Sequence, residues 1–379
     1  MRICHVSPHL PPDQAANALL PAELAAWNAA SGHEVSFVTQ PPAQGGQSTS
    51  SLPGPVAHVA ARSSSKLLRL SRLDTLRRAR SIGDALDRVA AEATLLHLHS
   101  NGLIVEVAAA WARRRKIPFV LTLYGTEIWH YSRRWPVDPF TRAYMHAQAV
   151  TFYSQRLLER ALALGLRRPN LSTVYPAVSG AFQPADDETR AAWRQSLGIA
   201  EPHVVLNVKR LHPLAAQSDL LKAFARVAGT RADVRLVICG TGPLAAALQQ
   251  EATALGIAEK VTFAGLVPNA EVARFAAIAD VFVLPSKLEA LPTVAVEALA
   301  AGTPVVSADH PGGLELHALF GDDVHVVPGG DITALAKAIY ARVSVPRRTL
   351  VGTSVLVDRN FGPAAVYSAY EALYRQAIL

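Results

Sequence analysis

Two glutamates, Glu289 and Glu297, are separated by seven residues in a stretch of the chain that is otherwise mostly apolar. An ionised carboxylate in apolar surroundings needs a partner, because removing a charge from water is costly. One interpretation is that an arginine elsewhere in the fold pairs with such an acid. The other is that both acids accept hydrogen bonds from the hydroxyl groups of a bound sugar. The pair alone does not decide between the two.

The residues around the two acids predict a strand followed by a helix. The run VFVLP at residues 281–285 is typical of a buried parallel strand, Pro292 suits the first turn of a helix, and Gly302 suits its end. Glu289 then lies in the connecting loop, and Glu297 lies about one and a half turns into the helix, ~7 Å along its axis. The N–H groups at the helix start can hold an anion between the two acids.

The composition bounds the class of protein. A chain of 379 residues that is 50% hydrophobic and 18% charged is long enough for two globular domains. No apolar run reaches the ~20 residues of a membrane span. The start of the chain, MRICHVSPHL, lacks the apolar core of a signal peptide. These observations predict a cytoplasmic protein.

The net charge of +7 comes mostly from arginine and favours acidic partners, such as nucleotides, phosphorylated substrates or an anionic membrane face. Residues 62–80 can form an amphipathic helix with Leu67, Leu70, Leu73 and Leu76 on one face. Such a helix is either an ordinary surface helix or a weak peripheral contact with the inner membrane face. Nucleic acid is not an expected partner, because no aromatic-basic pattern accompanies the charge.

Metal binding is not expected. Cys4 and Cys239 fall in predicted central strands, where they are small buried hydrophobes, and no Cys/His spacing typical of a metal site occurs. The sequence predicts no oligomeric state.

Short β-branched runs alternate with helix-length segments, which predicts an α/β protein with parallel sheets. The alternation breaks near residues 174–184. We therefore expect two doubly wound, Rossmann-like domains, residues 1–176 and 177–361, facing a central cleft, and a final helix at residues 362–379 that packs back on the first domain. Ligands bind at the carboxyl ends of the strands in such sheets.

The second half carries an ordered series of motifs that resembles glycosyltransferase family 4, whose members are retaining, nucleotide-sugar-dependent enzymes of the GT-B fold. The series consists of CGTGPLAAALQQEA (residues 239–252), KVTFAGLVPNAEVARFAAIADVFVLPS (260–286) and ALPTVAVEALAAGTPVVSAD (290–309). In the first half, LLHLHSNG (95–102) and VLTLYGTEIW (120–129) fall where the family has its His-rich strand end and its acceptor-side loop.

The resemblance implies roles in donor binding. Glu289 would bind hydroxyls of the transferred sugar, Glu297 would bind the ribose diol, and Arg210 would neutralise the diphosphate. The remaining donor contacts would come from the glycine turn, from residues near the base and from the start of the helix; these are Gly240, Gly242, Val267, Pro268, Leu291, Pro292, Thr293 and Val294. Gly240 and Gly242 are equally well explained as a plain β-to-α turn.

The chain departs from the family pattern in the loop after the first strand and beside Arg210. Ala15 and Ala16 replace the usual glycine pair in that loop, and this makes Asp13, Gln14 and Asn17 candidate contacts to the sugar or the acceptor. Capping of the helix is an equally good role for Asp13. Ala215 replaces the lysine that accompanies Arg210. Lys209 or His212 can compensate, although alternation along a strand predicts that Lys209 points away from Arg210.

A third departure affects the acceptor side. Tyr124 stands where the family has a histidine, and a phenol is a poor base at neutral pH. His99 or His97 can take over this role, although a histidine at a strand end is more often structural. Glu127 and Asp13 are the other candidate bases.

The expected function is a retaining transfer of a hexose-type sugar from a UDP- or GDP-linked donor to a small-molecule, glycan or lipid acceptor, with no cofactor and no metal. A non-catalytic GT-B protein that binds a nucleotide sugar is the alternative, and a sugar-nucleotide epimerase is less favoured.

Overall fold

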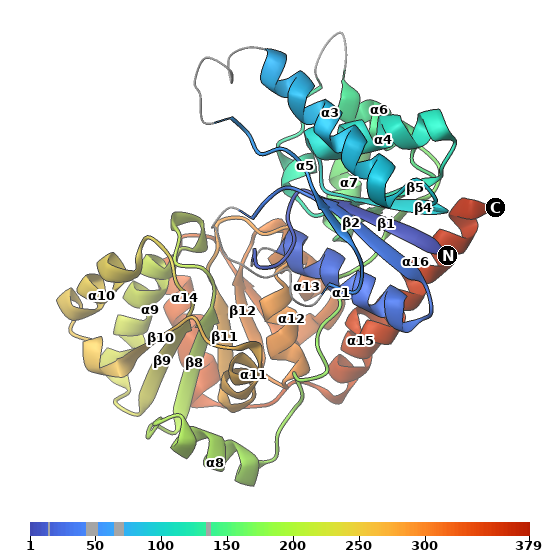
Figure 1. Ribbon diagram of the computed structural model, residues 1–379. Helices are drawn as coiled ribbons and strands as arrows, with labels where there is room; N and C mark the ends of the chain where they lie inside the picture. Colours follow the sequence, from blue (N-terminus) through green and yellow to red (C-terminus); the bar gives the residue numbers. More distant parts are fainter. Residues whose placement is uncertain (14–15, 43–51, 64–71, 134–137) are drawn as a thin grey trace. The chain divides into compact units, whose positions relative to one another are not determined.

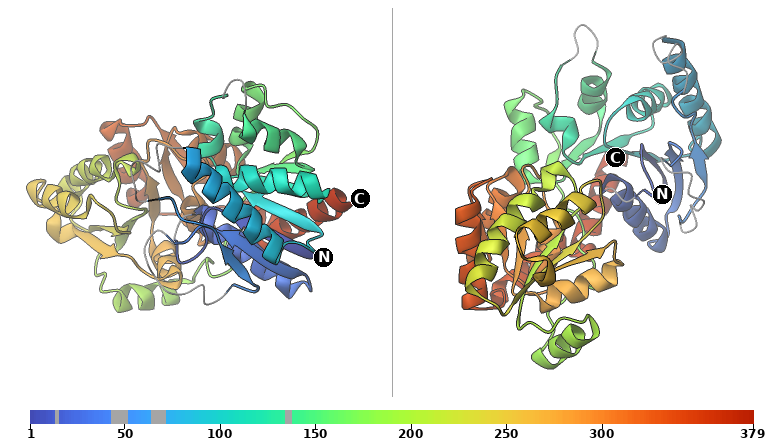
Figure 2. Two further views of the ribbon diagram at one scale, coloured as in Figure 1. Left: turned by 45° about the horizontal axis from the view of Figure 1, so that its top comes forward. Right: turned by 90° about the vertical axis from the view of Figure 1, so that its left-hand side faces the viewer.

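The computed structural model describes residues 1–13, 16–42, 52–63, 72–133 and 138–379. The described chain divides into two compact units (Figures 1 and 2). Unit 1 comprises residues 1–176 and 366–379, and unit 2 comprises residues 177–365.

The described residues of unit 1 form a seven-stranded parallel sheet in the order β3-β2-β1-β4-β5-β6-β7. Its strands are β1 (Arg2–Ser7), β2 (Glu34–Thr39), β3 (Val56–His58), β4 (Leu95–His99), β5 (Phe119–Leu123), β6 (Ala149–Phe152) and β7 (Leu171–Thr173). Its helices are α1 (Ala16–Ala30), α3 (Arg72–Val89), α4 (Leu103–Arg115), α5 (Thr126–Trp129), α6 (Pro139–His146), α7 (Gln155–Ala163) and most of α16 (Pro363–Ile378). Strands β4 and β5 are buried along their whole length, as parallel strands covered by helices on both faces must be.

The described residues of unit 2 form a six-stranded parallel sheet in the order β10-β9-β8-β11-β12-β13. Its strands are β8 (His203–Val208), β9 (Val234–Cys239), β10 (Val261–Gly265), β11 (Val281–Leu284), β12 (Val305–Ala308) and β13 (Val324–Val327). Its helices are α8 (Asp187–Ser196), α9 (Gln217–Thr230), α10 (Ala245–Ala254), α11 (Asn269–Ile278), α12 (Thr293–Ala300), α13 (Pro311–Phe320), α14 (Ile332–Ser344) and α15 (Val351–Phe361), and short 3-10 helices are η1 (Pro213–Ala215), η2 (Ala258–Lys260) and η3 (Gly321–Asp323).

The core of unit 2 lies between its sheet and the helices α9 and α14. Phe224 of α9, Leu236 of β9 and Ile339 of α14 are fully buried in one hydrophobic cluster. Complete burial of such a side chain stabilises the fold by about 1.5–3 kcal/mol. This packing holds the sheet rigid, so that the loops at the carboxyl ends of its strands are presented in fixed positions.

Local chemistry explains where the helices begin and end. Ser154 and Asp331 accept hydrogen bonds from the first-turn amides of α7 and α14. Helix α4 ends in three arginines at its negative pole, followed by Lys116 in a left-handed conformation. Gly302 also has a positive φ, of 82°, and follows α12 as expected.

The expected α/β architecture and the burial of both cysteines are confirmed. Pro292 differs slightly from the prediction, because it is the N-cap of α12 rather than part of its first turn. The expected helix at residues 62–80 is described only from Arg72 onwards. Leu67 and Leu70 lie outside the described residues, as does Ala15.

Candidate active site

Each sheet has one point at which the strand order reverses, and a crevice outside the strand ends at such a point is where doubly wound folds bind ligands. In unit 2 the order reverses between β8 and β11. Lys209 and Arg210 follow β8, and Glu289 lies in the loop between β11 and α12. The fold therefore brings two cations and one of the two glutamates to the same edge.

Glu289 has a basic partner. The ammonium nitrogen Nζ of Lys209 lies 2.6 Å from Oε1 of Glu289, with 29% and 14% of the two side chains exposed. The sequence predicts that Lys209 points away from Arg210, and the ion pair shows that Lys209 points toward Glu289. Lys209 lies beyond the last residue of β8, where the alternation of side chains along a strand no longer applies.

The glycine turn after β9 fixes the backbone that carries Lys209. A Cβ on Gly240 would lie 2.1 Å from the carbonyl oxygen of Lys209, and one on Gly242 would lie 2.3 Å from that of Leu211. The N–H of Lys209 also donates to the carbonyl of Cys239 at 3.0 Å. These two glycines are therefore required by the close approach of two backbone segments, before any ligand is considered.

The start of α12 lies beside Glu289 in the sequence. Ala295 and Val296 donate to the carbonyl of Pro292, whereas Thr293 and Val294 precede the first amide that can donate within the helix. Both of these residues are half-buried, and Leu291 is buried. Glu297 is half-buried between the buried residues Val296 and Ala298. The geometry places a helix N-terminus between the two acids, as the sequence predicts.

Arg210 is exposed, and its guanidinium makes no hydrogen bond or ion pair with a described residue. Ala215 is buried, with 3% exposure. The Nδ1 of His212 accepts a hydrogen bond from the N–H of Leu214 and caps η1, the 3-10 helix that ends at Ala215. On the other side of the glycine turn, Val267 is half-buried and Pro268 is the N-cap of α11.

His310 is a member of this site that sequence reasoning missed. Its Nδ1 accepts a hydrogen bond from the N–H of Gly313 and caps α13, and the N–H of Gly312 donates to the carbonyl of Glu289 at 3.0 Å. Burial lowers the pKa of His310 to about 4, with Glu289 and Lys209 acting in opposite directions. His310 is thus neutral at physiological pH. Pro311 at the first helical position was the signal that could have located this cap.

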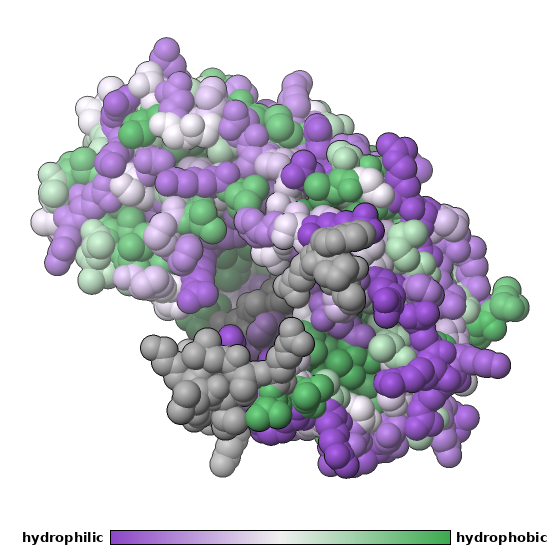
Figure 3. Space-filling view, turned by 90° about the horizontal axis from the view of Figure 1, so that it is seen from above, coloured by the Kyte–Doolittle hydropathy of each residue, from purple (hydrophilic) through white to green (hydrophobic). Residues whose placement is uncertain are grey.

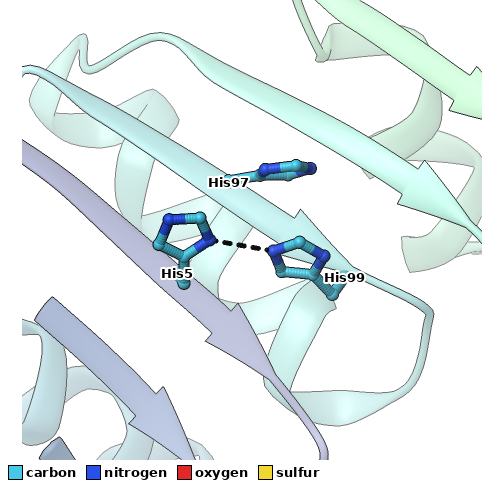
Figure 4. A group of neighbouring side chains, drawn as sticks. All are labelled: His5, His97 and His99. Carbon is cyan, nitrogen blue, oxygen red and sulfur yellow. Dashed lines mark hydrogen bonds between the residues drawn. The ribbon is translucent and has the colours of Figure 1, made fainter. Parts of the chain in front are cut away.

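In unit 1 the strand order reverses between β1 and β4, and three buried histidines meet there (Figure 4). His5 comes from β1, and His97 and His99 come from the same face of β4. One ligand nitrogen from each ring lies within 4.8 Å of the others. Each ring nitrogen already has a hydrogen-bonding partner, so a metal ion would have to displace the partners described next.

The hydrogen bonds of this histidine cluster form a chain that ends at Tyr124. Nε2 of His5 lies 3.1 Å from the amide oxygen of Asn28, Nδ1 of His5 lies 3.1 Å from Nε2 of His99, and Nδ1 of His99 lies 2.8 Å from the Tyr124 hydroxyl. Because the Asn28 oxygen can only accept, neutral His5 must accept from His99, and neutral His99 must accept from Tyr124. The proton of the Tyr124 hydroxyl is therefore directed at His99.

His97 links this cluster to the last helix of the chain. Its Nδ1 lies 2.6 Å from the hydroxyl of Tyr374 in α16, and its Nε2 lies 2.7 Å from that of Thr122. Tyr370 lies 3.5 Å from Thr122. The tyrosines of the final helix thus add hydrogen bonds to the packing that their spacing predicts.

Burial keeps the cluster uncharged. It lowers the pKa of His5 to about 4 and those of His97 and His99 well below the ordinary value. Desolvation also raises the pKa of Tyr124 well above its ordinary value, and the neighbouring Tyr370 and Glu127 add to this. His99 has 1% exposure and both ring nitrogens engaged, so it can act on a substrate only through Tyr124.

The other acceptor-side candidates differ in their surroundings. Glu127 has 3% exposure, and its two oxygens accept from Oγ of Ser100 at 2.5 Å and from the N–H of Gly125 at 2.7 Å. It therefore ties together the loops that follow β4 and β5. Asp13 lies 3.0 Å from Nδ1 of His9. Gln14 and the side chain of Asn17 lie outside the described residues.

Two Rossmann-like units with their polar residues at the strand-order reversals define the GT-B class of fold. Two solved structures share it over nearly their whole length. HepE from Anabaena, in complex with UDP and glucose, is 20% identical with a TM-score of 0.76 and 98% of each chain covered. Sucrose-phosphate synthase from Thermosynechococcus elongatus is 21% identical with a TM-score of 0.77, covering 99% of this chain and 98% of that one.

Two family models match the chain. The model of the glycosyl transferase 4-like domain matches residues 21–177, and the model of glycosyl transferases group 1 matches residues 189–344. The chain belongs to the glycosyltransferase family that these models describe.

Curated relatives match part of the chain. The GDP-mannose-dependent alpha-(1-6)-phosphatidylinositol monomannoside mannosyltransferase of Mycolicibacterium smegmatis is 32% identical over 63% of this chain and 63% of its own length. The D-inositol 3-phosphate glycosyltransferase of Mycobacterium marinum is 37% identical over 45% of this chain and 36% of its own length. The chain therefore spans less than two thirds of these relatives.

Within the part of the chain that the structure describes, no helix has both the length and the apolar character that crossing a membrane requires.

Proposed function

We propose that this protein is a retaining glycosyltransferase that moves a hexose-type sugar from a UDP- or GDP-linked donor to a small-molecule, glycan or lipid acceptor. The proposal rests on the residues found at the edge of unit 2 where β8 and β11 end. There Lys209 pairs with Glu289, Arg210 follows it in the chain, and α12 begins four residues after Glu289. Positive charge, a carboxylate and a helix N-terminus together suit a sugar diphosphate.

In this proposal each part of the donor has its own contacts. The amides of Leu291, Thr293 and Val294 and the guanidinium of Arg210 bind the diphosphate. Glu289 accepts hydrogen bonds from the transferred sugar and Glu297 from the ribose. Val267 lies near the base, where main-chain groups do the recognition. The exposure of Arg210 supports its role, because a guanidinium that makes no ion pair with a described residue is available to an anion at this edge.

The chemistry follows from these contacts. Negative charge accumulates on the diphosphate as the bond to the anomeric carbon breaks, and preorganised cations and N–H groups stabilise that charge. The acceptor hydroxyl attacks on the face from which the diphosphate leaves and gives its proton to the departing diphosphate, so the configuration is retained. We propose that Lys209, Arg210 and the helix N-terminus make a bound metal unnecessary. Activity that survives dialysis against EDTA would support this, and activity restored only by Mg²⁺ or Mn²⁺ would refute it.

Tyr124 is the proposed contact to the acceptor in unit 1. Since its proton is directed at His99, the phenol oxygen has only lone pairs to offer a ligand. It can therefore accept a hydrogen bond from an acceptor hydroxyl and orient that group. His99 and His5 act as positioning residues behind it.

The relatives suggest which substrates to test first. GDP-mannose appears in the name of one relative and inositol 3-phosphate in that of another. We therefore place GDP-mannose and UDP-hexoses first among donors, and inositol phosphates and phosphatidylinositol lipids first among acceptors.

The experiment is a donor panel. A transferase incubated with its donor should slowly release the nucleoside diphosphate without an acceptor, and Glu289→Ala should abolish this release. Glu251→Ala is the matched control, because Glu251 also pairs with a lysine in unit 2, at 3.5 Å. Binding with no turnover across donors and acceptors would instead indicate a non-catalytic protein. Epimerised donor with no released nucleoside diphosphate would indicate an epimerase.

We also propose that α3 makes a weak contact with an anionic membrane. Leu73 and Leu76 are each 64% exposed near its start, on a helix that also carries Arg77 and Arg78. On the face shown in Figure 3, hydrophobic residues are scattered among hydrophilic ones. Sedimentation with anionic vesicles that is reversed by high salt would support the contact. Absence of binding at low salt would refute it.

A further inference from the structure

We propose that Lys209 is the second cation of the donor site, and that its ion pair with Glu289 is the resting arrangement, exchanged for ligand contacts when a nucleotide sugar binds. The inference rests on the proposed function. It adds a residue and a step that neither the family pattern nor the comparisons supply, because the lysine of that pattern is replaced by Ala215.

The position of the pair supports an exchange. It bridges the ends of β8 and β11, on either side of the strand-order reversal, where a ligand would enter. The two side chains keep 29% and 14% of their surface exposed, so a ligand can reach both. A partner that offers more charge and more hydrogen bonds than a single carboxylate can displace such a pair.

Both partners are carried by fixed backbone. The carbonyl of Lys209 packs on Gly240, and its N–H donates to Cys239. The carbonyl of Glu289 accepts from the N–H of Gly312. Exchange therefore needs only rotation of two side chains, with no rearrangement of the loops.

The charges where β8 and β11 end explain why Lys209 would exchange Glu289 for a diphosphate. The alkyl side chain of Ala215 supplies no charge, His310 is neutral, and Arg210 makes no ion pair with a described residue. A diphosphate is a stronger partner for the Lys209 ammonium than a single carboxylate is, and sugar hydroxyls are donors for the carboxylate so released. Each charged group keeps a partner throughout, so the exchange avoids the cost of an unpaired, partly buried charge.

Lys287 is the other lysine that could serve as the second cation of the donor site. It is exposed in the same loop as Glu289, and its backbone N–H donates to the carbonyl of Leu214 at 2.8 Å. Its side chain makes no ion pair with a described residue, whereas that of Lys209 is already directed into the site. The two lysines can be separated by substitution.

The test is calorimetric titration of UDP and GDP into the full chain and its variants. Lys209→Met should weaken binding of the nucleoside diphosphate by about tenfold or more, since a charge-assisted contact is lost. Lys209→Arg should retain most of the affinity. Glu289→Gln should bind the nucleoside diphosphate more tightly, because Lys209 is freed, and yet lose turnover. Lys222→Met, which breaks the exposed pair with Glu251, is the matched control and should bind like the wild type.

Tighter binding by Glu289→Gln that disappears when Lys209→Met is combined with it is the decisive result, because neither damage to the fold nor the lost charge of Glu289 alone produces both effects. The inference is overturned if this variant binds no more tightly while Lys209→Met, folded by circular dichroism, binds like the wild type. It is also overturned if Lys287→Met weakens binding and Lys209→Met does not. Wild-type protein that binds neither UDP nor GDP would instead contradict the proposed function, and this inference with it.

Discussion

Lys209 and Glu289 form an ion pair of 2.6 Å across the point where the sheet of unit 2 reverses its strand order. The sequence predicts that the carboxylate of Glu289 needs a partner in its apolar surroundings, and Lys209 is that partner in this structure. The partner is a lysine from the adjacent strand end rather than an arginine from elsewhere. That strand end is also where ligands bind in doubly wound folds. The carboxylate of Glu289 can therefore pair with Lys209 in the free protein and still lie where a sugar would bind.

Arg210 should matter for turnover and not for stability. Arg210 is exposed and its guanidinium makes no hydrogen bond or ion pair with a described residue, so Arg210→Ala should leave the melting temperature unchanged. Loss of one preorganised charge at the diphosphate should lower kcat/KM for the donor by about 10²–10³-fold. Steady-state kinetics on both substrates measure this. Arg226→Ala, which removes an exposed hydrogen bond to Thr333 in the same unit, is the control and should be fully active.

Tyr124 should separate transfer from hydrolysis. Tyr124→Phe removes the oxygen that would orient the acceptor and leaves the donor site of unit 2 intact. We expect transfer to the acceptor to fall by roughly tenfold or more while hydrolysis of the donor is unchanged. Tyr340→Phe, at a surface position that is 45% exposed, serves as the control. Equal loss of both activities would show that Tyr124 is needed only for the fold.

The histidine cluster should make unit 1 unstable in acid. Burial lowers the pKa of His5 to about 4 from an ordinary 6.5, and those of His97 and His99 well below it, so the folded chain excludes protons that the unfolded chain binds. Their contribution is complete above pH 6.5 and is lost as the pH falls towards 4. The melting temperature should therefore decrease between pH 7 and pH 5, and less steeply in His5→Gln. A melting temperature independent of pH over this range would contradict the assignment.

Gly240 and Gly83 should respond oppositely to alanine. A Cβ on Gly240 would overlap the carbonyl of Lys209, and its φ of 137° disfavours other residues, so Gly240→Ala should destabilise unit 2 and weaken nucleotide binding. Gly83 lies inside α3 with no atom within 4 Å of an added Cβ. Gly83→Ala should stabilise the protein by about 0.5–1 kcal/mol. Thermal denaturation of both variants checks the pair.

Local patterns predicted the elements, because buried parallel strands and capped helices leave their signatures within a few residues. They also placed the start of α12 between Glu289 and Glu297. The contact between Lys209 and Glu289 has no local signature, since it joins the ends of two strands about eighty residues apart. The meeting of His5 with His97 and His99 depends on the register of β1 against β4, which joins residues about ninety positions apart. No local pattern contains that information.

We propose above all that the donor's diphosphate binds where β8 and β11 end. The measurement that checks this is a crystal structure of the full chain with the nucleoside diphosphate that binds more tightly, UDP or GDP. We expect phosphate oxygens within hydrogen-bonding distance of the amides that begin α12 and of Arg210, with the ammonium of Lys209 turned from Glu289 to the diphosphate. A nucleotide bound at another edge of the sheet, with the pair of Lys209 and Glu289 intact, would contradict it.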